Sequence, residues 1–225
     1  MQNQTAELSW KPGDVPVSEQ FDDPYFSLEN GLAETRHVFL DGNDLPARFG
    51  PGFHIAELGF GTGLNFLTTV LAWQKAGAPG PLTFTSFEAF PMSVTDMQRA
   101  LSAFPELRDP AGLLVAHWGP EGCCAEILPG VHLNVLTGDA NETLPAWDGL
   151  ADVWFLDGFS PAKNPGLWSP ELMHEVGAHT RAGGSFATYT AAGFVRRGLE
   201  AAGFEVTRSP GYGRKRHMSR GVLRS

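Results

Sequence analysis

A glycine-rich turn between an apolar segment and a helical pattern constrains the fold of this chain more than any other feature. The turn holds Gly59, Gly61 and Gly63 at alternate positions, and residues 54–58 before it are typical of a buried strand. After the turn, apolar residues recur at helical spacing as far as Gly77. Glycine lets the backbone turn tightly and lets a ligand approach without meeting a Cβ atom. The sequence therefore predicts a strand, a ligand-binding turn and a helix whose N-terminus faces a polar ligand.

The spacing of these glycines excludes two common phosphate-binding loops. A dinucleotide motif needs its last glycine where this chain has Leu64 or Phe66, and a P-loop ends in Gly-Lys-Ser/Thr. The pattern that begins at Glu57 instead resembles the first motif of class I S-adenosylmethionine-dependent methyltransferases, which holds a cofactor end without phosphate. A turn with a purely structural role fits the three glycines equally well, so the rest of the chain has to decide.

Length and composition fit one substantial α/β domain with a small extension. The chain has 225 residues, of which 42% are hydrophobic, and 16 Phe and 6 Trp are enough for a large core. No segment approaches the ~18 apolar residues of a membrane helix, and the N-terminus does not resemble a secretion signal. The two cysteines, Cys123 and Cys124, are adjacent, which disfavours a disulfide and offers no metal-ligand spacing. We expect a cytoplasmic protein without a metal ion.

Strand and helix patterns alternate after residue 52, which predicts a doubly wound, mostly parallel sheet over residues 53–225. Residues 1–52 are rich in aromatic residues and turns, and we expect them to form a hairpin cap over one end of the sheet. Within this cap the sequence predicts a strand at residues 35–40 and a turn at residues 41–44. Further strands are predicted at residues 81–87, 131–136, 152–156 and 184–190 and, as a terminal antiparallel hairpin, at 204–208 and 217–224; helices are predicted from Pro91 to Leu101 and over 192–202.

Four of the predicted strands end in an acidic residue or lead directly to one: Glu57, Glu88, Asp139 and Asp157. Because ligands of doubly wound sheets bind beyond the carboxyl ends of the strands, these side chains should surround one site. Glu88 could accept hydrogen bonds from two ribose hydroxyls, unless it is a loop acid exposed to water. Asp139 could accept a hydrogen bond from an adenine amino group, unless it makes an Asx turn or caps the helix that follows.

The segment after Asp157 is the most informative one chemically. It reads Asp-Gly-Phe-Ser-Pro-Ala-Lys-Asn-Pro, in which the acid and Phe159 precede two prolines. Amino-methylating enzymes of this fold place a similar loop at this point. A carboxylate there can hold an ammonium group, orient the amine and accept a proton, and an aromatic face can stack on a base or steady a cation. The alternative is a proline-rich turn with an incidental acid.

Charge is distributed unevenly along the chain. The net charge is −9, yet residues 196–225 hold eight Lys and Arg against two acidic residues. Residues 1–195 carry a net charge of −15. A basic edge on an acidic body is what a polyanion-binding surface would look like, and a solvated terminal hairpin explains it equally well.

Six segments together resemble one family. The match runs from about Phe21 to Met218 and is to the methyltransferase half of the bifunctional MnmC family, which makes 5-methylaminomethyl-2-thiouridine at the tRNA wobble position. The segments are Phe-Asp-Asp-x-Tyr-Phe-Ser from Phe21, Asn-Gly-Leu-x-Glu-Thr-Arg-x-Val-Phe-Leu from Asn30, the glycine turn from Glu57, Leu-Asp-Gly-Phe-Ser-Pro-Ala-Lys-Asn-Pro-x-Leu-Trp from Leu156, Gly-Phe-Val-Arg-Arg-Gly-Leu from Gly193, and Gly-Tyr-Gly-Arg-Lys-Arg from Gly211.

The resemblance implies a class I methyltransferase with a Rossmann-like, mostly parallel seven-stranded sheet. It implies N-methylation of the 5-aminomethyl group of the wobble uridine in the tRNA anticodon stem-loop, with S-adenosyl-L-methionine and without metal, flavin or membrane. The cofactor-binding residues that it implies are Glu57, Gly59, Phe60, Gly61, Thr62, Gly63, Asn65, Glu88, Asp139 and Asp157. The catalytic residues would be Asp157 and Phe159, and the substrate-binding residues Tyr25, Lys163, Arg196, Arg197, Arg214, Lys215 and Arg216.

The chain departs from the bifunctional members in one respect. It stops at Ser225 without a second glycine-rich motif for a flavin, so we expect the stand-alone, MnmD-like form, to which a separate enzyme would supply the aminomethyl uridine. The nearest alternative is another amine-alkylating enzyme of this fold, such as a polyamine aminopropyltransferase or a small-molecule N-methyltransferase, which would not need the basic C-terminal segment. A non-catalytic nucleotide-binding module is the other alternative.

Overall fold

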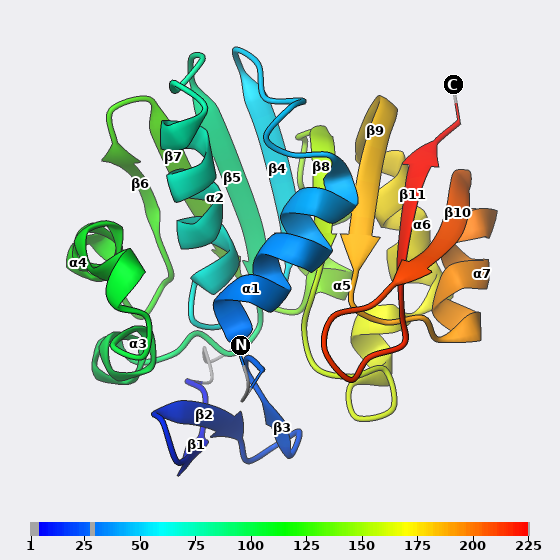
Figure 1. The fold of residues 1–225 in the computed structure, drawn as a ribbon. Coiled ribbons are helices and arrows are strands. Elements are labelled where there is room, and N and C mark those ends of the chain that lie inside the picture. The colour runs from blue at the N-terminus through cyan, green and yellow to red at the C-terminus, as the bar shows by residue number, and fades with distance from the viewer. Residues whose placement is uncertain (1–4, 28–29, 225) are drawn as a thin grey trace.

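A central sheet organises the structure, a computed structural model that describes residues 5–27 and 30–224 (Figure 1). Within this described part the sheet has eight strands, in the order β10-β11-β9-β8-β4-β5-β7-β6. These strands are β4 (Phe53–Leu58), β5 (Leu82–Glu88), β6 (Cys124–Leu128), β7 (Val131–Thr137), β8 (Ala151–Leu156), β9 (Thr180–Thr188), β10 (Phe204–Pro210) and β11 (His217–Leu223). A separate antiparallel sheet contains β1 (Leu8–Lys11), β2 (Val15–Ser18) and β3 (Asp23–Pro24).

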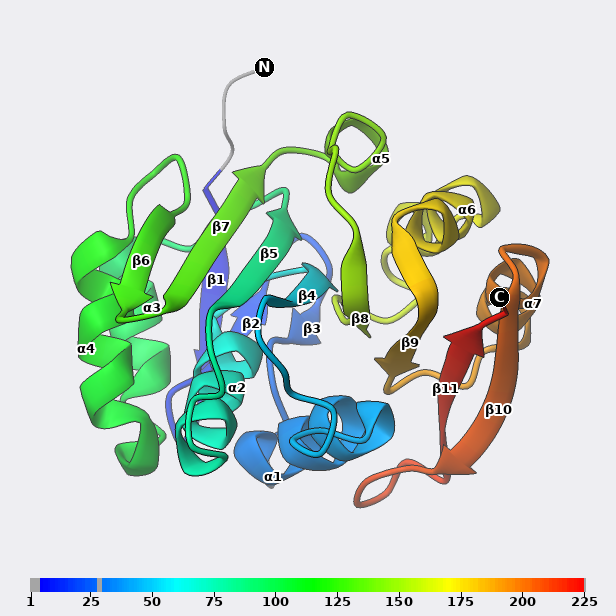
Figure 2. The same ribbon diagram turned by 90° about the horizontal axis from the view of Figure 1, so that it is seen from above.

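Helices connect the strands and cover both faces of the sheet (Figure 2). The α-helices are α1 (Gly31–Thr35), α2 (Leu64–Lys75), α3 (Val94–Leu101), α4 (Arg108–His117), α5 (Ala140–Thr143), α6 (Pro170–Ala178) and α7 (Gly193–Ala201). A π-helical segment, η1 (Arg36–Leu40), continues α1, and 3₁₀ turns occur at η2 (Asp41–Asn43), η3 (Pro105–Leu107) and η4 (Pro165–Trp168).

The predicted class, a mostly parallel doubly wound sheet, is confirmed. The five strands β9, β8, β4, β5 and β7 are parallel neighbours, and the terminal hairpin β10–β11 joins antiparallel to β9 through β11. The sheet has one strand more than the seven expected, because β6 pairs antiparallel with β7 at the edge. β6 is short and largely solvent-exposed, so its sequence carries no strong strand pattern.

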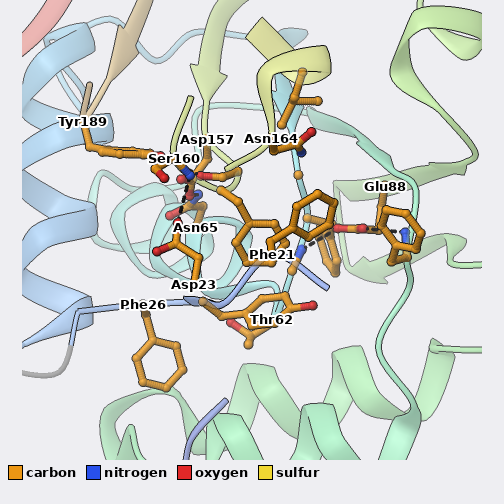
Figure 3. Close-up of a pocket in the computed structure, with 18 of the residues that line it drawn as sticks. Phe21, Asp23, Phe26, Thr62, Asn65, Glu88, Asp157, Ser160, Asn164 and Tyr189 are labelled. Carbon is orange, nitrogen blue, oxygen red and sulfur yellow. Dashed lines mark hydrogen bonds between the residues drawn. The ribbon is translucent and has the colours of Figure 1, made fainter. Parts of the chain in front are cut away.

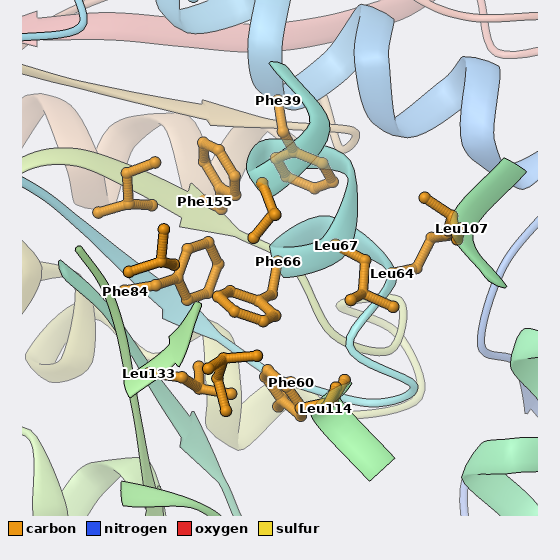
Figure 4. Close-up of a cluster of buried hydrophobic side chains, with 14 of the residues drawn as sticks. Phe39, Phe60, Leu64, Phe66, Leu67, Phe84, Leu107, Leu114, Leu133 and Phe155 are labelled. Carbon is orange, nitrogen blue, oxygen red and sulfur yellow. The ribbon is translucent and has the colours of Figure 1, made fainter. Parts of the chain in front are cut away.

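Two apolar cores lie on the two faces of the sheet, as alternation along a buried strand requires. In β8, Val153 and Phe155 join the core that α1, α2 and α4 cover, whereas Trp154 and Leu156 join the core under α6 and α7. Figure 4 shows the first core, in which residues of the glycine turn and α2, such as Phe66, pack against the sheet. The glycine turn is therefore anchored between a buried strand and a buried helix.

The strand expected at residues 35–40 is wrong, because this segment is helical. Asn30 accepts a hydrogen bond from the backbone N–H of Ala33 at 2.9 Å and so caps α1. The buried residues Leu32, Thr35 and Phe39 follow at spacings of three and four, which is the period of a helix. The β-branched and aromatic residues of the segment suggested a strand, but they lie on one helical face and pack on the sheet. The turn expected at residues 41–44 is the 3₁₀ segment η2.

The helix expected from Pro91 begins three residues later. Ser93 caps α3 by accepting a hydrogen bond from the backbone N–H of Asp96 at 3.1 Å. The helical spacing of Val94, Met97 and Leu101 predicts that all three share one apolar face; Met97 and Leu101 face the core, whereas Val94 in the first turn is exposed. Pro91 and Met92 therefore belong to the connection from β5 and not to the helix.

The N-terminal part of the chain lies at the carboxyl ends of the parallel strands. β1 and β2 form a hairpin there, below the sheet in the view of Figure 1. Leu32 and Phe39, however, belong to the same apolar core as the sheet, so residues 31–43 pack with the main domain. A boundary at residue 53 stays a prediction.

Two further expectations can be compared with the described residues. Cys123 is buried, Cys124 is exposed, and both are free thiols. None of the helices in residues 5–27 and 30–224 is both long and apolar enough to cross a bilayer.

Candidate active site

A cavity of about 1410 Å³ opens at the carboxyl ends of the parallel strands. The loops after β4, β5, β7 and β8 line one side of it, and the N-terminal segment and the loop between β10 and β11 line the other. It lies where strand order reverses, because the chain leaves β4 for β5 on one side and reaches β8 on the other. Its volume exceeds the ~300–1,000 Å³ of a typical pocket for one small molecule. A cofactor and part of a second substrate therefore fit together.

Two glycines of the turn line this cavity and could not be replaced without strain. Gly59 and Gly61 have φ angles of +81° and +56°. A Cβ atom on Gly59 would lie 3.1 Å from Cα of Gly158, and one on Gly61 would lie 3.1 Å from the ring of Tyr25. Gly63 does not line the cavity: a Cβ there would meet the side chain of Leu114 at 2.7 Å. The turn thus presents its backbone to the cavity and its third glycine to the core.

Glu88 joins the glycine turn to the end of β5. One carboxylate oxygen accepts the backbone N–H of Gly61 and the other accepts that of Phe90, both at 2.8 Å. The side chain is 8% exposed, and burial raises the pKa of this carboxyl, an effect that the backbone N–H groups oppose. Glu88 lines the cavity where a ribose-binding acid was expected.

Glu57 occupies a different place from the one its motif suggests. It is fully buried and does not line the cavity. Its carboxylate oxygens accept hydrogen bonds from Asn65 Nδ2 at 2.9 Å and Ser86 Oγ at 2.7 Å. Burial raises its pKa well above the usual value, although the two hydrogen bonds oppose this effect. Glu57 therefore supports the residues beneath the glycine turn.

Asn65 links Glu57 to Asp157. Its Nδ2 also donates to Asp157 Oδ2 at 2.7 Å, and Figure 3 shows the two side chains. Its Oδ1 accepts from Thr35 Oγ1 at 3.0 Å. Burial raises the pKa of Asp157 to about 6, against the lowering effects of the Asn65 hydrogen bond, the Gly158 backbone N–H and the charge of Lys215. A carboxylate with a pKa near 6 is suited to accept a proton near neutral pH.

Aromatic rings gather beside Asp157. The ring of Phe159 stacks on that of Phe21, with centroids 4.7 Å apart, and meets the edge of Tyr25 at 5.0 Å. Phe90 contacts the edge of Phe21 at 5.7 Å. Burial and the nearby charge of Glu88 raise the pKa of Tyr25, so that its hydroxyl stays protonated. These rings give the cavity an aromatic wall, and the face of such a ring can stack on a nucleobase.

Three hydrogen bonds hold the loop after β8. Trp168 Nε1 donates to the carbonyl of Phe159 at 2.9 Å, and the Tyr189 hydroxyl donates to the carbonyl of Gly158 at 2.9 Å. The backbone N–H of Ser160 donates to Asp23 Oδ2 at 2.8 Å. Because its backbone is held from three sides, the loop keeps Asp157 and Phe159 directed into the cavity.

Asp139 takes the structural role considered for it and lies at the cavity. Its Oδ1 accepts the backbone N–H of Asn141 at 2.9 Å and the Asn141 Nδ2 at 2.8 Å, so it caps α5. It also lines the cavity, as do Phe60 and Thr62 of the glycine turn. The cap fixes the carboxylate at the cavity edge, and an adenine contact stays a prediction.

The basic residues expected to bind substrate do not all lie at the cavity. Arg214 and Lys215 line it, on the loop between β10 and β11. Lys163 is paired with Asp22 and Asp23, at 3.3 Å and 3.7 Å. The remaining three, Arg196 and Arg197 on α7 and Arg216 on the same loop as Arg214, are at least partly exposed but do not line the cavity.

Several residues of the site were not predicted from the sequence. Phe21, Asp23 and Glu34 come from the N-terminal segment, and Phe90 and Tyr189 from the loops after β5 and β9. Only the fold brings them together, since Asp23 and Ser160 are 137 positions apart. The available signal was weak: Phe21, Asp23 and Glu34 lie in segments that resemble the family, but their spacing implies no role. Among the described residues, no cluster of three or more His, Cys, Asp or Glu side chains could hold a metal ion.

Comparisons with known proteins agree with this geometry. A family model described as an S-adenosyl-L-methionine-dependent methyltransferase matches residues 105–224. Relatives from Stutzerimonas stutzeri (strain A1501) and Caulobacter vibrioides, both named tRNA 5-methylaminomethyl-2-thiouridine biosynthesis bifunctional protein MnmC, are 47% identical over 99% and 93% of this chain. The chain spans about a third of their length, 35% and 36%.

Solved structures show the same fold. MNMC2 from Aquifex aeolicus has a TM-score of 0.80 at 22% identity, covering 100% of this chain and 72% of its own. A precorrin-6y C5,15-methyltransferase from Geobacter metallireducens has a TM-score of 0.53 at 11% identity, covering 95% of each chain.

Proposed function

The chain belongs to the S-adenosyl-L-methionine-dependent methyltransferase family, and we propose that it methylates the 5-aminomethyl group of the wobble uridine in tRNA. The observation that carries this proposal is the position of Asp157 beside the stacked ring of Phe159 in a cavity with room for two ligands. The names of the relatives support the choice of substrate, since both describe biosynthesis of 5-methylaminomethyl-2-thiouridine.

The residues of the glycine turn fit the cofactor that the family implies. Gly59 and Gly61 leave space for it. α2 begins at Leu64, and its N-cap residue, Gly63, offers no side-chain cap to the first backbone N–H groups of the helix. Glu88 would hold the ribose hydroxyls and Asp139 the adenine amino group. S-adenosyl-L-methionine supplies an activated methyl group when bound. The residues of this chain would then have to position the substrate amine in line with that methyl group.

Asp157 would prepare the amine for this transfer. A protonated amine has no lone pair, so the substrate must lose a proton before it can react. The Asp157 carboxylate would hold the ammonium form on binding, accept its proton and pass it to solvent. Ionised again, it would orient the neutral amine and stabilise the cationic product. Phe159 would stack on the uracil ring and fix the direction of the aminomethyl group.

Basic residues around the cavity entrance would bind the anticodon stem-loop. Arg214 lines the cavity, Arg216 lies on the same loop, and Arg196 and Arg197 lie on α7, so these four residues would form the basic surface. Contacts of this kind to phosphates carry no sequence information but hold the RNA in register. The wobble base would then leave its stack and enter the cavity.

Further expectations belong to the same proposal. Residues 53–225 would form the methyltransferase domain and residues 1–52 an extension that completes the cavity. The transfer itself would need neither metal nor flavin, a separate enzyme would supply the aminomethyl uridine, and the protein would act in the cytoplasm.

Nucleoside mass spectrometry tests the proposal directly. The purified protein is incubated with tRNA that carries 5-aminomethyl-2-thiouridine and with cofactor bearing a deuterated methyl group, and the digested nucleosides are analysed. We expect the wobble nucleoside to gain one labelled methyl group, and unmodified tRNA to gain none. Labelling of spermidine or another free amine in place of the tRNA would favour a small-molecule enzyme. Cofactor binding without transfer to any amine would favour a non-catalytic module.

A further inference from the structure

An ammonium group already lies in the cavity near Asp157, and it belongs to Lys215. Its Nζ lies 2.7 Å from Glu34 Oε1 and 4.2 Å from the centroid of the Tyr189 ring. All four residues line the same cavity. A carboxylate and an aromatic face are the two groups that proteins use to bind an alkylammonium ion.

The two groups that surround this ammonium are fixed in the fold. Glu34 lies in α1, which Asn30 caps, and only 13% of its side chain is exposed. Tyr189 follows β9, and its hydroxyl is bonded to the carbonyl of Gly158, the neighbour of Asp157. Burial raises the pKa of Tyr189, and the charges of Asp157, Asp23 and Glu34 add to this effect. The ring face and the carboxylate are therefore in place whether or not a cation lies between them.

Lys215, by contrast, comes from a solvent-exposed loop. It lies between β10 and β11, and 47% of its side chain is exposed. Figure 1 shows this loop at the same end of the sheet as α1. An ion pair in which one partner is half exposed contributes little to stability, about 0.2–1 kcal/mol. The ammonium of Lys215 can thus leave Glu34 at small cost.

The substrate of the proposed function carries the same chemical group. Lysine ends in a methylene-linked primary ammonium, and so does a 5-aminomethyl uracil. The charges of Glu34 and Lys215 act on Asp157 in opposite directions, Glu34 raising and Lys215 lowering its pKa, which places both close to the reacting group.

We infer that Glu34 and Tyr189 form a subsite for the substrate's ammonium group, which Lys215 occupies until that group displaces it. This inference rests on the proposed function and adds two residues to it. Lys215 then acts as an internal competitor and not as a phosphate contact. An unmodified uridine, which has no cation to exchange for Lys215, would bind without displacing it.

Discrimination between two RNAs measures this subsite separately from the phosphate contacts. Two anticodon stem-loops are compared, one with 5-aminomethyluridine and one with uridine at the wobble position, both with S-adenosylhomocysteine present. The ratio of their dissociation constants, measured by fluorescence anisotropy, isolates the contribution of the amine. Lys215→Met keeps the length of the side chain and removes its charge, so we expect the preference for the aminomethyl RNA to rise about two- to fivefold, the range of a half-exposed ion pair.

Two further variants complete the test. Glu34→Gln removes the carboxylate charge and should reduce the preference at least as much as Lys215→Met raises it. Arg216→Met is the matched control: it lies beside Lys215 but does not line the cavity, so it should weaken both RNAs equally and leave the ratio unchanged. The affinity of each variant for S-adenosylhomocysteine shows that it is folded.

The outcomes separate this inference from the proposed function. A ratio that stays constant or falls in Lys215→Met overturns the inference, because Lys215 would then support the site and not compete for it. A wild-type ratio in Glu34→Gln overturns it as well. If Lys215→Met, which leaves the subsite without a competitor, binds both RNAs equally, the subsite is refuted, and the proposed function fails too only if the wild-type protein transfers no methyl group to the aminomethyl RNA.

Discussion

Replacing Asp157 by Asn tests the central step of the proposed mechanism. Asparagine has nearly the same shape, so it can still meet Asn65 across the 2.7 Å contact, but it carries no charge and accepts no proton. The variant should therefore fold and bind cofactor like the wild type. Any loss of turnover would then report on the carboxylate itself.

The size of the loss follows from the environment of Asp157. Burial moves its pKa from 3.8 to about 6, which makes the carboxylate roughly 100-fold more basic than an ordinary aspartate. A charge-assisted hydrogen bond to the substrate ammonium adds ~1.5–3 kcal/mol, and each ~1.4 kcal/mol corresponds to a factor of ten in rate. We expect kcat to fall by about two orders of magnitude or more, within the range of a positioned acid–base group.

The pH profile gives the decisive measurement. Because the ionised form of Asp157 is the active one, wild-type kcat/KM should fall tenfold per pH unit below about 6. Asp157→Asn should lack this limb, and its rate should rise at high pH, where solvent supplies the neutral amine. Single-turnover methylation of the aminomethyl stem-loop between pH 5 and 9 measures both. Near wild-type turnover at pH 7, or an unchanged acid limb in the variant, would refute the role given to Asp157.

Four other predictions follow from the geometry of the site. Asp157→Asn should raise the Tm at pH 8, because the pKa of Asp157 is higher in the folded than in the unfolded protein and its buried charge therefore destabilises the fold. This gain in Tm should shrink as the pH falls through about 6 and vanish near 3.8, where Asp157 is protonated in both states; a constant Tm difference in calorimetry would contradict this. Glu88→Ala should weaken S-adenosylhomocysteine binding by about 2–3 kcal/mol, because the ribose hydroxyls lose an acceptor and the N–H of Gly61 loses its partner; unchanged titration heats would remove Glu88 from the cofactor site. Glu57→Gln should change the same affinity by less than about threefold, since Glu57 does not line the cavity; a loss as large as that of Glu88→Ala would show otherwise. Arg214→Ala with Arg216→Ala should raise the KM for tRNA and flatten its dependence on salt by about one to two phosphate contacts, leaving cofactor affinity unchanged; wild-type salt dependence in the double variant would exclude both residues from the RNA surface.

The strand ends were predictable because a simple rule of topology governs them. Apolar alternation located β4, β5, β7 and β8, and the carboxyl ends of parallel neighbours must meet at one edge. The direction of each side chain was harder to predict. Glu57 lies one residue before the end of its strand, and its side chain points beneath the turn toward Ser86, whereas Asp157 follows its strand and faces the cavity.

Local propensity failed where tertiary packing overrode it. Val38, Phe39 and Leu40 favour a strand by composition, yet the cap at Asn30 begins a helix whose apolar face packs on the sheet. Contacts between segments that are far apart in the sequence cannot be predicted from the spacing of residues along the chain. Nothing in the sequence pairs Glu34 with Lys215, which is 181 positions away.

The position of β11 between β9 and β10 has a consequence for how the protein is made. β10 is synthesised before β11 but touches the sheet only through it, because the order is β10-β11-β9. While the ribosome is still adding residues 211–223, the edge of β9 is unpaired and β10 has no partner strand. An open edge of this kind attracts other chains, so the growing polypeptide depends on rapid completion or on chaperone cover during this interval. The loop that carries Lys215 to the cavity connects β10 to β11, so this side of the cavity forms only after β11 pairs with β9.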